Sequence, residues 1–428
     1  MKKRIWMLTA STVLALSALA ANIQTDRTWY LAGEAMTVGV KADDAAVAYI
    51  ELCDTHGMMA GATVCLRAGT GTGILQLPAD LHSGYYALTV YTRNAATASR
   101  RLVAVVNALR KSTADDIQWM PADSCWAEGA APHTGSDPAH TGSDPAVRPA
   151  SHEGQTPCEQ TVEKPADLSE TEGHIVKARV SPSYGGHTFS ASQITPALSI
   201  IGKQIHYFEG KMVNDSLALF FTYGVYGRQP LVLAATTATG EHLPVELISP
   251  FEALLPKSLP HLVFHYSRSQ VEARSLAMQR RQMAMANSGA VAPSVYCDTA
   301  FGTKPHPTYN LDEYRQFLTV GEVMLEYVSC VRNTKVNGVP RLIVRNEDDP
   351  YDSSLPTLVL IDGMPVSDVE RLLGYDARRV HHINIYGGQY SFGRGVYNGI
   401  LSFVTRSGQL TNYPTEPQMQ YLLYEFPK

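Results

Sequence analysis

Many short apolar runs mark this chain, and each is closed by glycine, proline or a polar turn. VAYIELC (47–53) and YYALTVYT (85–92) are rich in β-branched and aromatic residues, and the turn signals THG, GTGTG and HSG separate such runs. Short strands at this spacing are typical of β-sandwiches. We therefore predict that residues 22–108 form a β-sandwich.

The same pattern returns over residues 166–256. The runs HIVKARVS, PALSIIG, LALFFTYG and PLVLAATT are again short and bounded by glycine or polar residues. A second immunoglobulin-like sandwich is the economical interpretation, although a barrel fits the pattern as well. With 428 residues, 45% hydrophobic and 18% charged, the chain has the composition of a globular protein of several domains.

The first 21 residues resemble a secretory signal. The basic start KKR precedes an apolar run from Ile5 to about Leu19, which ends on small alanines. The run is shorter than the ~20 apolar residues of a membrane span, so we prefer a signal peptide (1–21) to a membrane anchor. We expect an exported protein with no transmembrane segment after signal cleavage. The net charge of −5 and the lack of a large basic stretch argue against nucleic acid as a partner.

Two connecting regions differ in composition from the predicted sandwiches. HTGSDPA occurs twice in tandem, at 133–139 and 140–146, in a stretch rich in Pro, Ser, Gly, Asp and Thr. Few apolar residues are available there for burial, so we predict a disordered linker over 109–165.

Residues 257–296 are predicted as a helix with a connector, because good helix formers run from 267 to 289. We interpret Met278, Met283 and Met285 as the packed side of that helix.

Six cysteines permit disulfides in an exported chain. They are Cys53, Cys65, Cys125, Cys158, Cys297 and Cys330. Six cysteines allow about 15 pairings, and we prefer the sequential one, since Cys53 and Cys65 flank a plausible turn. A Cys125–Cys158 bond would close a loop over the linker. Free buried thiols are the alternative, and no CxxC or His-rich setting supports metal binding.

Residues 297–410 predict a small α/β domain. Thr319 and Glu322 have the spacing of a capping box, and apolar residues at helical spacing follow them. LVLIDGMPV (358–366) reads as a buried strand that stops at an Asp-Gly turn. Ser367 and Glu370 repeat the capping-box spacing before a second helix, for which Gly374 suits the C-terminus. VHHINIYGG and GILSFVTRSG supply two more strands, and 411–428 is predicted as a C-terminal tail.

The first predicted sandwich is similar to the macroglobulin-like MG2 domain. In TDRTWYLAGE, a first-strand pattern of that family is matched by Thr25, Asp26, Arg27, Tyr30, Gly33 and Glu34, with Ala32 in place of the usual proline. A later strand pattern is matched by Leu77, Pro78, Leu81, Gly84 and Tyr85. The resemblance implies a β-sandwich.

The α/β region resembles the plug domain of TonB-dependent outer-membrane receptors, especially the starch-utilisation type. The residues that carry the motif are Asp362, Gly363, Pro365, Asn398, Gly399 and Gly408, supported by Ile361, Val366, Val380, Ile383, Ile385, Phe392, Gly393, Ile400, Ser402, Thr405 and Arg406. A plugged receptor barrel has about 22 strands, whereas 20 residues follow Gly408. We therefore expect the plug-like fold without its own barrel. The order of the two domains resembles a family of exported, uncharacterised Gram-negative envelope proteins.

No local motif supports catalysis. Cys158 and Gln160 in PCEQ are two positions apart, whereas a macroglobulin thioester joins residues three apart. We expect the adjacent His381 and His382 to point to opposite faces of a strand, so that they do not bind one ion together. RNEDDP (345–350) lacks EF-hand spacing and reads as a solvated acidic loop. We predict no catalytic, cofactor-binding or metal-binding residues.

The sequence therefore predicts a multidomain, mainly β protein, with two immunoglobulin-like sandwiches followed by a small α/β plug-like domain. The preferred function is a non-enzymatic envelope protein, periplasmic or associated with the outer membrane. It would act as a binding or scaffold module linked to outer-membrane transport. Its partner would be an outer-membrane or periplasmic protein, such as a barrel from another chain. The alternative is an enzyme, a glycan or peptide hydrolase, whose site is assembled from dispersed residues.

Overall fold

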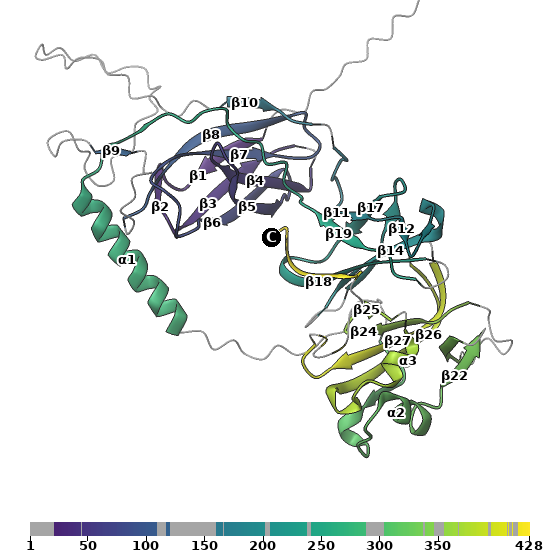
Figure 1. The fold of residues 1–428 in the computed structure, drawn as a ribbon. Helices are drawn as coiled ribbons and strands as arrows, with labels where there is room; N and C mark the ends of the chain where they lie inside the picture. The colour runs from purple at the N-terminus through teal and green to yellow at the C-terminus, as the bar shows by residue number, and fades with distance from the viewer. Residues whose placement is uncertain are drawn as a thin grey trace, which may run out of the picture. The chain divides into compact units, whose positions relative to one another are not determined.

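The protein is mainly β and contains several separate sheets, as the sequence predicts. The computed structural model describes residues 21–43, 45–108, 117–119, 160–165, 167–201, 206–237, 241–287, 304–336, 339–345, 355–366, 368–392, 395–408, 410, 413 and 418–428. The chain divides into two compact units (Figure 1). Unit 1 contains the residues up to Glu172 together with Ala253–Asn287, and unit 2 contains Gly173–Glu252 together with Ser288–Lys428.

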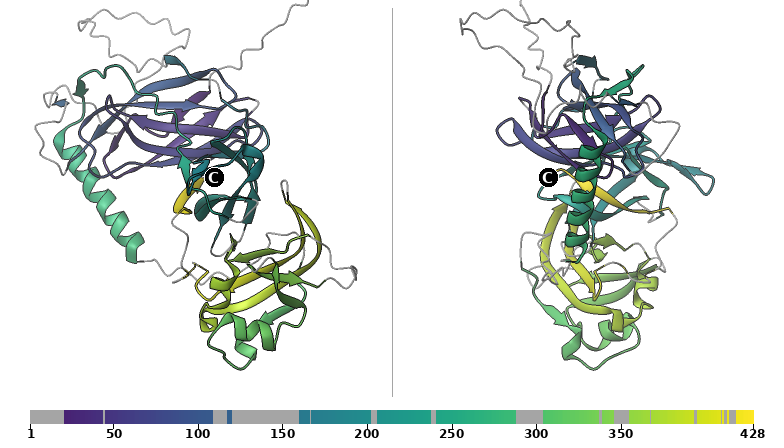
Figure 2. Two further views of the ribbon diagram at one scale, coloured as in Figure 1. Left: turned by 45° about the vertical axis from the view of Figure 1, so that its right-hand side comes forward. Right: turned by 90° about the vertical axis from the view of Figure 1, so that its left-hand side faces the viewer.

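Unit 1 contains two sheets that enclose one core. One sheet has the order β1-β3-β6, and the other has the order β10-β8-β7-β4-β5, with β2 parallel to β8. Figure 2 shows the strands of this unit in purple and blue from two directions. The strands are β1 (Asn22–Thr25), β2 (Trp29–Leu31), β3 (Ala35–Lys41), β4 (Val47–Cys53), β5 (Met58–Cys65), β6 (Thr70–Gln76), β7 (Gly84–Tyr91), β8 (Thr97–Val106) and β10 (Gln160–Glu163). Met36, Val38 and Val40 alternate inward from β3, as a strand with one buried face requires.

The TDRTWYLAGE segment forms a hydrogen-bonded turn in unit 1. Tyr30 donates its hydroxyl proton to Asp26 Oδ1 over 2.6 Å, and the backbone N–H of Thr37 donates to the same oxygen. Glu34 accepts from the backbone N–H of Leu31 and pairs with Arg27. Gly33 has φ +82°, a conformation that side chains disfavour. These residues therefore stabilise the turn through hydrogen bonds and an ion pair within the segment.

The region predicted as a linker contains two short strands. β9 (Ile117–Trp119) pairs in parallel with β20 (Leu262–Phe264), and β10 pairs with the edge of β8. The prediction of a disordered linker over 109–165 is therefore wrong at these strands, because β10 pairs with a sheet edge and Ile117 and Trp119 of β9 pack against the cluster that contains Trp29 and Phe264. The tandem repeat lies outside the described residues. Because β9 and β10 both belong to unit 1, this segment connects two strands of one unit.

The predicted helix is present as α1 (Arg268–Asn287), and its first part is packed. Val271 is buried, and Met278 contacts the cluster that contains Trp29 and Phe264. Met283 is 67% exposed, so its assignment to the packed side is wrong, and the side chain of Met285 is outside the description. Among the described residues, no helix combines the length and apolar character needed to cross a bilayer. Residues 1–20 of the predicted signal are also outside the description.

Unit 2 begins with a second pair of sheets around a core. Their orders are β16-β17-β11-β19 and β15-β14-β18-β28, and a small hairpin, β12-β13, lies apart from them. The elements are β11 (His174–Val180), β12 (Ser183–Tyr184), β13 (His187–Thr188), η2 (Ala191–Gln193), β14 (Ile194–Ile200), β15 (His206–Glu209), β16 (Lys211–Met212), β17 (Leu217–Thr222), β18 (Gly227–Thr237), β19 (Val245–Ile248) and β28 (Gln420–Phe426).

The predicted C-terminal tail contains a strand of this second sheet pair. β28 pairs antiparallel with β18 from Gly227↔Phe426 to Leu233↔Gln420. Tyr424 and Phe426 point into the core, and the Tyr424 hydroxyl lies 2.7 Å from Nε2 of His174 on β11. The tail assignment for 411–428 is therefore wrong over 420–426, because the alternating apolar residues of YLLYEF bury one face of a strand.

The α/β module follows between β19 and β28. Its sheet has the order β21-β26-β27-β24-β25, and β22-β23 form a separate hairpin. The elements are β21 (Thr308–Asn310), η3 (Leu311–Glu313), α2 (Val320–Glu326), β22 (Val331–Val336), β23 (Val339–Val344), β24 (Leu358–Ile361), β25 (Met364–Pro365), α3 (Val369–Leu373), η4 (Ala377–Arg379), β26 (Val380–Phe392) and β27 (Gly395–Thr405). LVLIDGMPV therefore supplies β24 and the edge strand β25, while β27 is central.

The helix caps of the module are set locally. Thr319 and Glu322 form the predicted capping box of α2. The N-cap of α3 is Asp368, whose side chain accepts from Arg371 N, and Gly374 is the C-cap. The prediction of Ser367 as that N-cap is therefore wrong by one position: Asp368, an N-cap residue about as good as Ser, starts the helix instead. Ser367 itself is outside the description.

The two faces of the module's sheet are covered by different partners. Val359 and Ile361 of β24 pack with α2 and α3 in one cluster. Leu358 and Leu360, which point to the opposite face, pack with Ala197 of β14 and with other residues of the second sheet pair. The Tyr207 hydroxyl of β15 also hydrogen-bonds Tyr397 of β27, and burial raises the pKa of Tyr397 to about 12. The sheet pair therefore covers one face of the module within unit 2.

The preferred Cys53–Cys65 disulfide is wrong. Both residues are free thiols, and the β4–β5 register places Cys53 opposite Met58 and Cys65 opposite Val47. The two cysteines are therefore separated by ~20 Å along the hairpin, whereas a disulfide requires Cα atoms within ~7 Å. Cys330 is also a thiol, 3.5 Å from the Tyr309 hydroxyl. Cys125, Cys158 and Cys297 lie outside the described residues.

Candidate functional site

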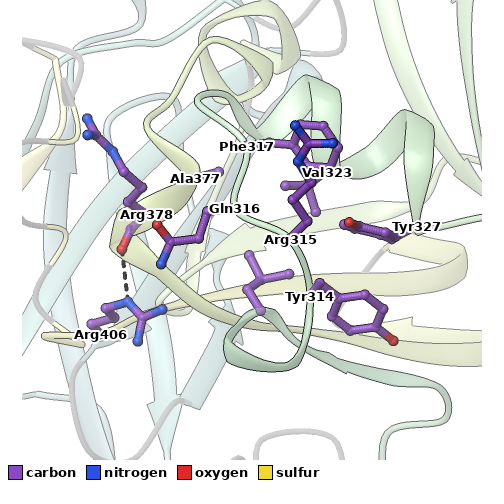
Figure 3. A pocket seen from close by; sticks show the side chains of 10 residues that line it. Tyr314, Arg315, Gln316, Phe317, Val323, Tyr327, Ala377, Arg378 and Arg406 are labelled. Carbon is purple, nitrogen blue, oxygen red and sulfur yellow. Dashed lines mark hydrogen bonds between the residues drawn. The ribbon is translucent and has the colours of Figure 1, made fainter.

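A shallow hollow lies beside α2, between the loop that precedes this helix, η4 and the end of β27, and its empty volume of about 290 Å³ includes open solvent. Figure 3 shows Arg378 and Arg406 on one side of it and Tyr314 and Tyr327 on the other. The lining residues are Leu311, Tyr314, Arg315, Gln316, Phe317, Val323, Tyr327, Ala377, Arg378 and Arg406. Three aromatic rings and three guanidinium groups are thus combined in a lining without a carboxylate.

The aromatic side of the hollow is built by the segment between η3 and α2. Asn310 caps η3 by accepting from Asp312 N, and the capping box of Thr319 starts α2. Between these caps the chain has no regular structure, and its aromatic rings collect against the helix. The ring centroids of Tyr314 and Tyr327 are 4.5 Å apart, and those of Phe317 and Tyr327 are 5.5 Å apart. The half-buried rings form an apolar wall.

Two of the three arginines are fixed by aspartates that lie outside the lining. Arg378 donates to both carboxylate oxygens of Asp376, over 2.8 and 2.9 Å. Arg406 pairs with Asp312 and donates from Nε to the carbonyl oxygen of Arg378. Hydrogen bonds from the guanidinium groups lower the pKa of both Asp312 and Asp376. The aspartates therefore remain ionised and hold the two guanidinium groups in place.

Arg315 differs from the other two arginines. All three side chains are exposed, but Arg315 forms no ion pair within the described part of the chain. Two nearby carboxylates are engaged elsewhere: Glu322 accepts from the backbone N–H groups of Leu318 and Thr319, and Glu313 accepts from the side chain of Asn310. The charge of Arg315 is therefore available to a ligand at the hollow.

Two large apolar side chains are exposed on the segment that builds this site. Leu318 is 66% exposed and Leu325 is 83% exposed. Leu318 follows the lining residue Phe317, and Leu325 lies on α2 between the lining residues Val323 and Tyr327. Single exposed leucines are ordinary on a protein surface. Two of them on the short stretch of chain that also supplies the aromatic wall make this part of the module a candidate binding surface, although Leu325 lies on the face of α2 away from Val323 and Tyr327.

The six residues that carry the plug-like motif lie outside the hollow, whereas the supporting residue Arg406 lines it. The motif residues around Asp362 form a buried hydrogen-bond network. Asp362 is fully buried, with φ +48°, and Gly363 has φ +88°, so the predicted turn is present. The Asp362 carboxylate accepts from Thr405 N at 2.7 Å, Thr405 Oγ1 at 2.5 Å and Leu410 N at 2.9 Å. Gly408 N donates to Thr405 Oγ1. Burial raises the pKa of Asp362, against the effect of these hydrogen bonds.

The other motif residues hold strands together. Pro365 lies in β25 opposite Leu360. Asn398 is buried, and its backbone N–H donates to the carbonyl oxygen of Pro356. Gly399 has φ +80°, and a Cβ there would lie 2.8 Å from Cβ of Val344. None of these motif residues lines the hollow.

The two adjacent histidines lie side by side, contrary to prediction. A register shift between Val380 and His382 interrupts the regular alternation of β26. As a result, the Nδ1 atoms of His381 and His382 are 3.0 Å apart. His381 Nε2 also lies 3.5 Å from Asp312. Among the described residues, no group of three or more His, Cys, Asp or Glu side chains is placed to hold a metal ion. Most of RNEDDP (346–350) lies outside the described residues.

The histidine pair predicts a pH dependence. Burial, together with His381, lowers the pKa of His382 to about 4, from its usual ~6.5. Between these values the unfolded chain binds more protons than the folded chain, so stability should fall as the pH drops through this window. Urea unfolding of unit 2 at several pH values measures the slope. His382→Gln should flatten it, and an unchanged slope in this variant would contradict the assignment.

A second group of ionisable residues is buried in unit 1. Glu51 accepts from the Tyr91 hydroxyl at 2.7 Å and from the backbone N–H groups of Ala253 and Leu254. Glu170 accepts from the Tyr49 hydroxyl and from Arg93, both at 2.7 Å. Burial and the charge of Glu51 raise the pKa of Cys53 to about 12, so its thiol remains protonated. This buried network binds backbone and side chains of the protein itself, which is a structural role.

Comparison with known proteins gives no assignment: no protein-family model matches the chain, and no curated protein is significantly similar to it.

The hollow beside α2 was not predicted from the sequence. The sequence feature that could have indicated the hollow is the segment YRQFL, which lies immediately before a capping box. There, two aromatic residues, an arginine and a leucine occur together in a stretch without helical or strand periodicity.

Proposed function

We propose that this chain is a non-enzymatic, exported protein of the cell envelope whose α/β module binds another envelope protein. The observation that carries the proposal is the stretch 314–327, which combines the exposed Leu318 and Leu325 with the aromatic and arginine side chains that line the hollow. Tyr and Arg are enriched in binding hot spots, and aromatic residues including Phe are enriched at interfaces. The sheet pairs act as the scaffold that carries this module.

The packing of unit 2 supports this choice of surface. One face of the module's sheet is covered by the second sheet pair through Ala197, Tyr207, Leu358 and Leu360. The other face carries α2 and α3, and the hollow lies beside α2. A partner that engages the module therefore has the helix side as its accessible surface. The resemblance to receptor plug domains makes an outer-membrane or periplasmic protein, including a barrel from another chain, the expected partner.

A crosslinking experiment tests the proposed surface. A photoreactive residue at position 325 of the full-length protein, expressed in its native cells, should capture one envelope protein. The same residue at position 74, where Ile74 is 67% exposed in unit 1, should not capture that protein. The captured protein is then purified, and its affinity for the full-length chain is measured directly.

Replacing both leucines should weaken this binding strongly. Burying one leucine contributes about 1.5–3 kcal/mol, so Leu318→Asp with Leu325→Asp should reduce affinity by at least about tenfold. The thermal stability should change little, because both side chains are exposed. Ile74→Asp is the matched control, with unchanged affinity. Unaltered binding by the double variant would exclude this surface.

A further inference from the structure

The three guanidinium groups of the hollow beside α2 are unequally compensated. Arg378 is paired with Asp376, and Arg406 is paired with Asp312, so these two charges are largely neutralised. Arg315 has no such partner in the described part of the chain, and no carboxylate belongs to the lining. The hollow therefore has a net positive charge centred on Arg315, beside the apolar wall of Tyr314, Phe317 and Tyr327.

We propose that the hollow beside α2 receives a carboxylate side chain of the partner protein, presented next to an aromatic or aliphatic side chain, and that Arg315 pairs with that carboxylate. This inference rests on the proposed function and adds the chemistry of the ligand. A guanidinium group binds a carboxylate through two parallel hydrogen bonds, which is stronger and more directional than a neutral contact. The neighbouring aromatic rings accommodate the apolar side chain of the same segment.

The hollow is shallow and open. Its empty volume of about 290 Å³ includes open solvent, so it does not enclose a small molecule as pockets of roughly 300–1,000 Å³ do. A side chain of a peptide segment would instead lie against its lining from the solvent side. Leu318 and Leu325, exposed on the same stretch of chain, would then contact the flanking residues of that segment.

The charge distribution favours an acidic protein segment over a nucleic acid. Only one of the three arginines in the lining is uncompensated, and the whole chain carries a net charge of −5. Binding of a polyanion draws on many uncompensated cations along its backbone. A single accessible guanidinium beside apolar groups instead matches one carboxylate in an otherwise apolar segment.

Peptide binding tests the inference on the full-length protein. One labelled peptide alternates glutamate with phenylalanine and leucine, and a matched peptide has glutamine at each glutamate position. At low salt the acidic peptide should bind at least about tenfold more tightly than the glutamine peptide, and this preference should decrease as salt is added. Arg315→Glu should abolish the preference. Arg341→Glu, at an exposed arginine of β23 in the same unit, should retain it.

The outcomes separate the inference from the function on which it rests. Equal affinity for the two peptides, no binding of the acidic peptide, or wild-type behaviour of Arg315→Glu would each overturn the role of Arg315. If the envelope partner is still captured from position 325 in that case, the proposed function stands with a different ligand chemistry. If no partner is captured from position 325, the proposed function itself fails.

Discussion

Arg93→Met is expected to destabilise unit 1 by about 3–5 kcal/mol, since it leaves buried carboxylates without their cation. The Arg93 side chain is 2% exposed and pairs with Glu170, which is 0% exposed, over 2.7 Å and with Asp167 over 3.1 Å. Its guanidinium also lies 4.9 Å from the ring centre of Tyr49. Methionine retains much of the volume but provides no charge and no donor.

Tryptophan fluorescence during urea unfolding measures this effect selectively. All four tryptophans lie within the first 126 residues, and Trp29 is buried in unit 1. Adding Glu170→Gln to Arg93→Met should restore part of the lost stability, because it removes one uncompensated charge. Arg101→Met on β8 is the matched control, with a change below about 1 kcal/mol expected for a partly exposed residue. Equal effects of the two arginine substitutions would contradict the role of the buried ion pairs.

Asp362→Ala is expected to destabilise unit 2 by about 3–5 kcal/mol, because three donors lose their acceptor at about 1–1.5 kcal/mol each and alanine disfavours a positive φ. The donors are the N–H and hydroxyl groups of Thr405 and the N–H of Leu410. Asp362→Asn should cost less, about 1–3 kcal/mol, since asparagine tolerates this backbone conformation and buries no charge.

The near-UV circular dichroism of tyrosines reports on both units, whereas tryptophan fluorescence reports on unit 1 alone, because unit 2 contains no tryptophan. A transition seen only in the tyrosine signal is therefore that of unit 2. The transition seen by tryptophan fluorescence should remain unchanged in both Asp362 variants, because these residues belong to unit 1. Asp368→Ala removes only the exposed cap of α3 and should cost about 1 kcal/mol. It is the reference with which the destabilisation by Asp362→Ala is compared. If Asp362→Ala costs no more than Asp368→Ala, the buried carboxylate network does not stabilise the module.

Features set by a few consecutive residues were predictable from the sequence. The capping box of Thr319 and Glu322 and the turn at Asp362 and Gly363 are both present, because each depends on side chains within three positions. Most short strands also follow from apolar alternation. The histidine pair shows the limit of such reasoning. Period-two alternation separates His381 from His382, but a bulge in β26 brings their rings together, and nothing in the local sequence marks that bulge.

Features that depend on distant residues were not predictable. Glu51 and Tyr49 have the pattern of a solvent face of β4, yet every residue of β4 is buried, because chain segments near Glu170 and Ala253 cover that face. The hollow beside α2 likewise combines residues near position 315 with Arg378 and Arg406. Its existence depends on the packing of η4 and β27 against α2, which periodicity does not encode.

The position of β28 affects the order in which unit 2 can form on the ribosome. β18 acquires its outer neighbour only when Gln420–Phe426 have emerged, after the whole α/β module has been synthesised. Until then the edge of β18 and the core residues beneath Tyr424 and Phe426 are open to other chains, a state that favours aggregation. Folding of the second sheet pair is therefore a late event, and we expect its nascent form to depend on chaperones until the last strand is added.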